Sequence, residues 1–183
     1  MRHLLLFLVV VLTSFPERLG AQVPDATAVQ TAAVQHILAA LRDGEQLPEG
    51  PIGLDRRILQ RVPYADPRTG EPFGWSYPLG ELREPGQDSV LREQLGDAEL
   101  RDYENAVTCA TQSGRSCRLL HVVALFALAE PTLPTDSTAE VIVAVQWRSS
   151  VIKMPVAKAR YSVRLQREPC GWVVANVSTL SIT

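Results

Sequence analysis

The stretch AKARYSVRLQR, residues 157–167, alternates between apolar or aromatic side chains and polar ones. Successive side chains of a β-strand point to opposite faces, so this spacing predicts a strand with one buried and one solvated face. The predicted buried side chains are Ala159, Tyr161, Val163 and Leu165. The predicted outer side chains are mainly basic and include Lys158, Arg160, Arg164 and Arg167. A sheet that buries one face needs a second layer of structure to cover it, so other segments of the chain should supply further strands and that layer.

Three neighbouring segments also have strand character. Residues 119–129 are almost wholly apolar, as expected of a strand covered on both faces. Residues 138–148 place Val141, Val143, Val145 and Trp147 on one face. The sequence EPCG at 168–171 predicts a turn, and residues 172–182 predict a returning strand. Short connections favour antiparallel neighbours, so we expect three to four antiparallel strands in the C-terminal part.

The N-terminal part has helical periodicity. Asp25 is a candidate helix cap, and Asp43 and Gly44 form a pair that is typical of a helix end. The apolar stripe between them consists of Val29, Ala33, Val34, Ile37, Leu38 and Leu41. Residues 54–59 are expected to form a short helical turn. The predicted class is α+β, with the N-terminal helix packed on the antiparallel sheet.

Residues 62–87 contain five prolines and four glycines, so they predict an irregular loop. Its aromatic side chains are Tyr64, Phe73, Trp75 and Tyr77. They fit either a recognition loop or a flap whose rings hold it on the core, and we favour the flap. Two short helices are expected to follow. Asp88 is a candidate cap for the first, and Gly96 is expected to end it.

Composition limits the function classes. The chain has 183 residues, is 46% hydrophobic, and carries 18 Lys and Arg against 20 Asp and Glu. These values are typical of a globular domain and argue against disorder or a coiled coil. The net charge of −2 lacks the basic excess of proteins that bind nucleic acid. Acidic residues predominate before residue 118 and basic residues after it. We expect one domain over residues 22–183.

The first 21 residues resemble a signal peptide. Arg2 precedes an unbroken apolar run at residues 4–12, which is shorter than a membrane-spanning helix requires. The small residue Ala21 suggests cleavage before Gln22; a short membrane anchor is the alternative. We therefore expect a secreted or periplasmic protein that has no membrane contact after the signal is removed.

Three cysteines bear on that location. Cys109 and Cys117 are separated by a polar stretch, and a disulfide between them is the favoured pairing in an oxidising compartment. Cys170 would then be left over, although its pairing with either of the others remains open. The chain has no C-x-x-C spacing and its histidines are isolated, so the sequence predicts neither a metal site nor a cofactor.

The end of the chain resembles the NTF2-like (cystatin-like fold) superfamily. The similarity lies in RYSVRL at residues 160–165, the turn, and GWVV at residues 171–174, together with the first helix. The resemblance implies that the helix packs into a strongly curved sheet and that a cone-shaped pocket opens between them. The side chains that this arrangement would place in the pocket are Val34, Leu38, His121, Tyr161 and Trp172. Members of the family serve as enzymes, ligand-binding domains and dimers.

Catalytic motifs are absent from the sequence, including nucleophile elbows, phosphate loops and zinc-protease motifs. The resemblance makes His36 and His121 candidate acid/base residues, and His121 the better one because apolar residues flank it. A hydrogen-bonded structural histidine is the favoured interpretation of His121. We therefore predict an exported, non-catalytic domain that binds a small ligand or a protein. One alternative is an exported enzyme that uses His121. The other is a self-associating structural domain, which would form a homodimer.

Overall fold

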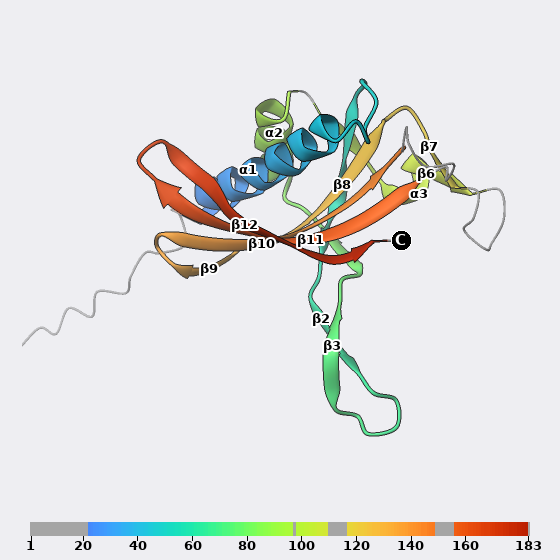
Figure 1. The fold of residues 1–183 in the computed structure, drawn as a ribbon, viewed down its shortest axis with the longest axis vertical. Helices are drawn as coiled ribbons and strands as arrows, with labels where there is room; N and C mark the ends of the chain where they lie inside the picture. Colours follow the sequence, from blue (N-terminus) through green and yellow to red (C-terminus); the bar gives the residue numbers. More distant parts are fainter. Residues whose placement is uncertain (1–21, 97, 110–116, 149–155, 183) are drawn as a thin grey trace, which may run out of the picture.

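The computed structural model describes residues 22–96, 98–109, 117–148 and 156–182. The predicted signal peptide lies outside these residues. The helices and strands follow one another as α1 (Gln22–Asp43), β1 (Ile52–Leu59), β2 (Val62–Ala65), β3 (Pro72–Ser76), β4 (Leu79–Leu82), α2 (Pro85–Gln94), β5 (Glu99–Arg101), α3 (Tyr103–Ala106), β6 (Val107–Cys109), β7 (Cys117–Leu119), β8 (Ala124–Ala129), β9 (Thr132–Thr135), β10 (Thr138–Trp147), β11 (Ala157–Glu168) and β12 (Gly171–Ile182). Figure 1 shows their arrangement, and the α+β class is confirmed.

An eight-stranded sheet forms the body of the molecule. Its main strands follow the order β12-β11-β10-β8-β1-β4, while β5 also pairs with β1 and β9 with β10. The pairs β1–β8 and β1–β5 are parallel, and the remaining pairs are antiparallel. The sheet is therefore mixed and larger than the predicted three to four strands. The helical turn predicted at residues 54–59 was wrong, because this segment lies in β1.

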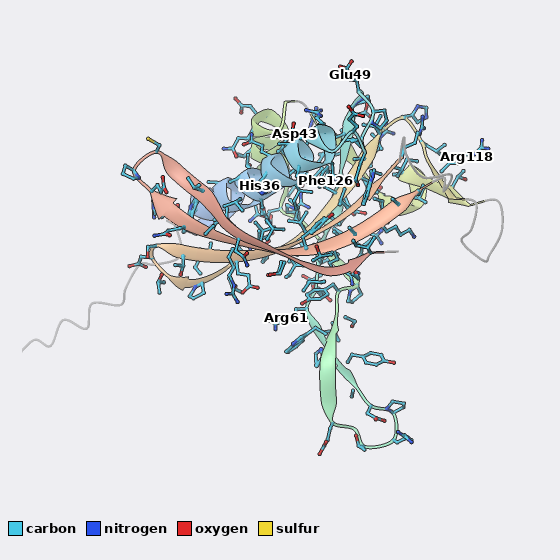
Figure 2. The ribbon with its side chains drawn as sticks, viewed as in Figure 1. His36, Asp43, Glu49, Arg61, Arg118 and Phe126 are labelled. Carbon is cyan, nitrogen blue, oxygen red and sulfur yellow. The ribbon has the colours of Figure 1, made fainter. Side chains whose placement is uncertain are left out.

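The helix α1 covers one face of this sheet (Figure 1). Its apolar stripe is nearly or fully buried at Val29, Ala33, Val34, Ile37 and Leu41, none of which is more than 5% exposed. The stripe packs in one cluster with side chains from the sheet, among them Phe126, which Figure 2 labels below α1. Burial of each large apolar side chain stabilises the fold by roughly 1.5–3 kcal/mol. The helix end predicted at Asp43 is confirmed, whereas the helix begins before Asp25.

The face assignment along β11 is confirmed except at its end. Val163 and Leu165 are buried in the main core, as predicted. Arg167 was predicted on the opposite face, but its Nη1 lies 3.4 Å from Asp25 Oδ2 in α1. Its guanidinium also lies 5.7 Å from the ring centre of Trp172. Arg167 follows Leu165 by two positions and therefore points to the same side, so that prediction was wrong.

The irregular loop predicted at residues 62–87 is replaced by regular structure. The strands β2 and β3 form a hairpin, followed by β4 and the first turn of α2. The hairpin, residues 62–76, projects from the side of the sheet opposite α1, and we call it the arm (Figure 1). Three prolines and two glycines within it do not prevent pairing, because Val62 and Ser76 close the ladder at its base.

A buried ion pair joins β4 and α2 to β1. Arg83 Nη1 donates a hydrogen bond to Asp88 Oδ1 at 3.0 Å, and its Nη2 donates to the carbonyl of Asp55 at 2.7 Å. Arg83 and Asp88 are each 3% exposed. Burial lowers the pKa of Arg83 and raises the pKa of Asp88, because desolvation opposes both charges more than pairing favours them.

The predicted helix cap at Asp88 was therefore wrong. Glu84 occupies the cap position of α2 without a side-chain hydrogen bond, and Pro85 begins the helix. Proline suits this place because its missing N–H would have no helical acceptor there. Gly96, with a φ of 71°, follows the helix end as predicted.

A second, smaller core lies at one end of the sheet, on the face opposite α1. It contains Ala106, Val107, Leu119, Val122, Leu125 and Val156. The short pair β6–β7 belongs to it and places Cys109 opposite Cys117 in register. The side chains of these two cysteines lie outside what the structure describes, so their disulfide stays a prediction. Cys170 is free and exposed at the tip of the β11–β12 hairpin.

Candidate functional site

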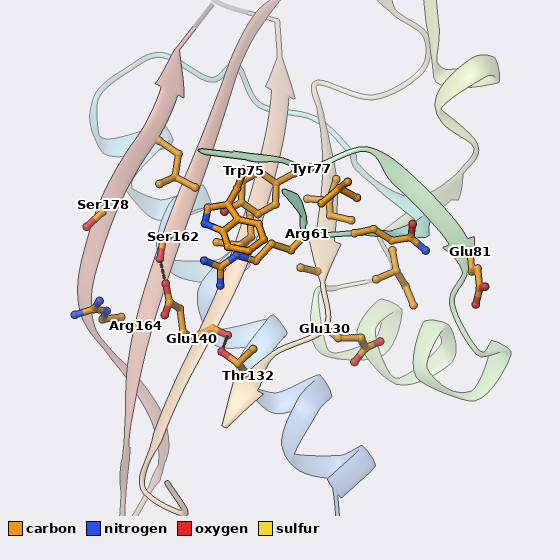
Figure 3. A pocket seen from close by; sticks show the side chains of 17 residues that line it. Arg61, Trp75, Tyr77, Glu81, Glu130, Thr132, Glu140, Ser162, Arg164 and Ser178 are labelled. Carbon is orange, nitrogen blue, oxygen red and sulfur yellow. Dashed lines mark hydrogen bonds between the residues drawn. The ribbon is translucent and has the colours of Figure 1, made fainter. Parts of the chain in front are cut away.

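A groove with a volume of 830 Å³ lies on the outer face, which we define as the face of the sheet opposite α1. We call it the outer groove. Its lining comes from most of the sheet and from the base of the arm: Ile58, Leu59, Gln60, Arg61, Val62, Trp75, Tyr77, Glu81, Ala129, Glu130, Thr132, Glu140, Ile142, Ser162, Arg164, Ser178 and Leu180. Figure 3 shows the arm residues Arg61, Trp75 and Tyr77 facing the polar side chains of β10 and β11.

The sheet side of the outer groove is polar and ordered by hydrogen bonds. Ser162 Oγ donates to Glu140 Oε1 at 2.5 Å, and Thr132 Oγ1 donates to the backbone carbonyl of Glu140 at 3.3 Å. Arg164 is the cross-strand partner of Glu140, and Ser178 is the partner of Ser162. These side chains share one face because partners across an antiparallel pair point the same way. They offer a ligand hydroxyl groups, one carboxylate and one guanidinium.

The arm side of the outer groove is built around two aromatic rings. The Arg61 guanidinium lies 4.0 Å from the ring centre of Trp75. Arg160 lies 5.2 Å from the ring centre of Tyr77, which links the outer basic side chains of β11 to the arm base. Such contacts contribute about 0.5–1 kcal/mol at exposed sites and orient both partners. Trp75 is nevertheless 51% exposed, so much of its surface remains available for contact.

The tip of the arm is a tight turn that its own side chains stabilise. The backbone N–H of Gly70 donates to the carbonyl of Asp66 at 2.8 Å, and the N–H of Asp66 donates to the carbonyl of Glu71 at 2.9 Å. Asp66 Oδ1 also accepts from the N–H of Arg68 at 2.8 Å. Gly70 has a φ of 73°, a conformation that glycine adopts without strain. The local sequence therefore closes the arm.

The two faces of the arm present different aromatic rings. Pro63 is paired with Trp75, whereas Tyr64 is paired with Gly74, so the two rings point to opposite sides. Tyr64 is 52% exposed, which matches the exposure of Trp75. Pro63 has no N–H to offer to an added strand, and this favours contact through the side chains of the arm over contact through its edges.

The two strand ends that lead into the arm are held together at its base. The backbone N–H of Gln60 donates to the carbonyl of Pro78 at 2.9 Å. A Cβ added at Gly80 would lie 2.2 Å from the Gln60 side chain, so glycine leaves room for Gln60 at this junction. The groove wall formed by the arm depends on this packing.

Charges in the outer groove are mixed. Arg61 and Arg164 lie with Glu81, Glu130 and Glu140 along its length. In Figure 3, Arg164 and Glu140 lie at one end, whereas Glu81 and Glu130 lie toward the other. This arrangement does not form the continuous basic surface that nucleic acid requires. It fits a ligand that carries groups of both signs or many hydrogen-bonding groups.

The predicted pocket residues do not line the outer groove. Val34 is fully buried in the main core, and Leu38, Tyr161 and Trp172 pack against that core from its border. His121 was predicted to point into the interior, but it is exposed in a bend between β7 and β8. Its φ of 65° breaks the strand that the apolar run at 119–129 predicted. The structure thus brings four candidates together as core and separates His121 from them.

The described residues offer no other clear chemical centre. None of the described His, Cys, Asp and Glu side chains form a group of three that could hold a metal ion. His36 lies exposed on α1. Within the described ranges, no helix combines the length and the hydropathy of a bilayer-spanning segment.

Comparisons with protein-family models, with curated proteins and with solved structures found no match. The resemblance to NTF2-like domains therefore stays a prediction.

The sequence did not predict this groove, although it indicated some of the residues that line it or lie beside it. The alternation along β11 placed Arg160 and Arg164 on the outer face, and both lie there. The aromatic content of residues 62–87 pointed to a recognition loop, which was the less favoured of two interpretations. No local pattern could show that the arm and the outer face of β11 form one groove, because they are far apart in the sequence.

Proposed function

We propose that this protein is an exported binding domain that holds a segment of a partner protein between the arm and the outer face, while the partner also contacts the far face of the arm. The observation that carries this proposal is the exposure of Tyr64 and Trp75 on the two faces of one projecting hairpin, beside an 830 Å³ groove. Trp, Tyr and Arg are the residue types that most often dominate protein interfaces, and Arg61 adds the third. A two-stranded hairpin alone is marginally stable, so a partner would also stabilise the arm.

A small amphipathic molecule is the second candidate ligand. The groove volume lies within the range of about 300–1,000 Å³ that is usual for such sites. Apolar side chains such as Ile142 and Leu180 line it together with a few polar groups, including Ser162 and Glu140. A ligand of this size would contact Trp75 but would not reach Tyr64 on the far face of the arm.

Export is part of the same proposal. It rests on the apolar run at residues 4–12 and is supported by the pairing of Cys109 with Cys117 across β6 and β7. Antiparallel partners have Cα atoms about 4.5–5.5 Å apart, within the range that a disulfide spans. Disulfides persist mainly in oxidising compartments outside the cytosol. Mass spectrometry of the exported protein should find Gln22 at its N-terminus, and a membrane-bound form that retains residue 1 would contradict this.

The partner can be identified with a photoreactive amino acid placed at Tyr64, at Trp75 or, as a control, at Val173. Val173 is also exposed, at 45%, and does not line the groove. Irradiation of the producing cells should attach the same foreign polypeptide at both arm positions and no foreign polypeptide at Val173. No polypeptide at either arm position would refute the proposal.

Binding of the identified partner is then measured with alanine variants. We expect Tyr64→Ala and Trp75→Ala each to weaken binding at least tenfold, which corresponds to about 1.4 kcal/mol. Val173→Ala should leave the affinity unchanged, and circular dichroism should show all three variants folded. Loss with Trp75→Ala alone, together with a small bound molecule in native mass spectrometry, would favour the second candidate.

A further inference from the structure

The strand β12 forms a long and uncharged edge of the sheet. It is the last strand in the sheet order, and no strand in the described part of the chain pairs with its outer side. Its twelve residues, GWVVANVSTLSI, contain neither a charged residue nor a proline. Val173, Leu180 and Ile182 are exposed on it. An edge of this kind presents unpaired backbone N–H and C=O groups to any strand that fits.

The other strands with a free edge in the described chain have five residues or fewer, and several carry features that oppose pairing. Pro63 in β2, Pro72 in β3 and Pro134 in β9 each remove a backbone donor. The opposite edge of the sheet is β4, which has only four residues and includes Glu81. Short strands, prolines and charges are the usual means of preventing edge contacts. Their absence from β12 indicates that this edge has a partner.

We propose that β12 pairs in antiparallel fashion with β12 of a second copy of this chain, so that the two sheets become continuous across a two-fold axis. Such an interface is formed by the same surface on both copies. A charged strand would place like charges opposite each other near the axis, which destabilises pairing. β12 avoids this repulsion because it is uncharged along its whole length.

Two bulges determine where the strands can pair. The register between β11 and β12 omits Ala175 and Leu180, so these residues are the extra ones on β12. Bulges disturb the ladder and increase the local twist, which makes pairing next to them poorer. The regular stretch at residues 176–179 lies between them. The contact is therefore short, and we expect a dimer that forms in a concentration-dependent manner.

The direction of the side chains limits the register further. Ser178 lies opposite Ser162 on the outer face, whereas Val177 lies opposite Val163 on the helix side. Antiparallel partners point to the same face, so the two-fold axis must pass beside a residue that lies opposite the same residue of the second copy. At the middle of the regular stretch, that residue is Val177 or Ser178. With the axis at Val177, Asn176 of one copy lies opposite Ser178 of the other. Amide and hydroxyl groups of this kind already interact within one chain, where Asn176 Nδ2 donates to Ser178 Oγ at 3.3 Å.

The proposed dimer would place both outer grooves on the same side of the joined sheet. Ser178 and Leu180 belong to the groove wall, so each groove lies next to the dimer axis. Both arms would project in the same general direction from one surface. A partner with two binding segments could then occupy both sites, and the second contact would become intramolecular.

The test uses single cysteines in a Cys170→Ser background. Val177→Cys and Ser178→Cys place a thiol at the two candidate axis positions, and Gln166→Cys is the control, exposed on the neighbouring strand β11. A residue on the two-fold axis lies opposite the same residue of the second copy, at a distance that a disulfide can span. We expect linked dimers on mild oxidation at one of the two axis positions and little linkage at Gln166.

A second pair of variants measures the association without cysteines. Ser178→Lys should reduce the dimer fraction in analytical ultracentrifugation, because in either register it places the lysines of the two copies directly or diagonally opposite each other at the axis. Gln166→Lys adds the same charge on β11 and should associate like the unmodified chain. A purified chain that stays monomeric at every concentration would overturn the proposal. Binding of a foreign strand along β12, in place of a second copy, would also overturn it. Equal linkage at all three cysteine positions would also overturn it.

Discussion

Removal of the Arg83 side chain should be among the most damaging single changes to this fold. Arg83 and the Asp88 carboxylate are buried together, and Arg83 also donates to the carbonyl of Asp55 in β1. Arg83→Met would leave a buried carboxylate without its cation, which typically costs about 3–5 kcal/mol. With a urea dependence of about 1–3 kcal/mol per molar, the unfolding midpoint should fall by about 2 M. Tryptophan fluorescence and circular dichroism during urea titration would measure this change.

The double variant Arg83→Met with Asp88→Leu provides the decisive comparison. Burial disfavours both charges, so replacing the pair by apolar side chains should recover most of the lost stability. Arg68→Ala at the arm tip is the control, because Arg68 pairs with Asp66 while 89% exposed. Such exposed pairs contribute about 0–1 kcal/mol. A loss at Arg83 as small as that at Arg68, or additive losses in the double variant, would refute this reasoning.

Three further predictions concern the core, the pH dependence and the cysteines. Phe126→Ala should lower the free energy of unfolding by about 3–5 kcal/mol, because Phe126 is fully buried; urea titration tests this, and a loss below about 1 kcal/mol would contradict it. Burial raises the pKa of Tyr161 above 10.0, so the unfolded chain ionises first as the pH rises. The free energy of unfolding should therefore fall above pH 10.0 more steeply in the unmodified protein than in Tyr161→Phe, and equal slopes would contradict the raised pKa. Peptide mapping without reduction should find Cys109 linked to Cys117 and Cys170 free, whereas a link to Cys170 would contradict the β6–β7 register.

The parts of the fold that sequence reasoning predicted are those with strong periodicity. The stripe that includes Val34 and Ile37 and the alternation through Val163 are long enough to specify both the element and its buried face. The prediction failed at Arg167, where a basic side chain was assigned to the solvent face against the alternation. A long aliphatic stem and a carboxylate at Asp25 let that residue lie on the helix side.

The segments predicted wrongly are those in which partners distant in sequence decide the structure. β1 is flanked by a Pro/Gly connection and has little periodicity, but its pairing with β8 makes it a strand. Residues 62–87 contain enough proline to suggest a loop, although hairpins tolerate proline at free edges. The outer groove combines side chains from the arm with side chains from β10 to β12. The alternation along β11 and the aromatic content of residues 62–87 each indicated some of the residues that line it. That these residues form one groove could be seen only from the topology of the folded chain.

The pairing of early strands with late ones has a consequence for how the chain acquires its structure. Ile52 in β1 lies opposite Ala124 in β8, and α1 packs against β10, β11 and β12. The apolar stripe of the first helix thus finds much of its cover in strands that are synthesised long after the helix itself. Long chain loops must close before these contacts can form, and proteins dominated by such contacts fold in milliseconds to seconds. The nascent chain consequently lacks much of its core until these strands have been synthesised, and until then its apolar segments are open to chaperones or to a translocation machinery that accepts unfolded chains.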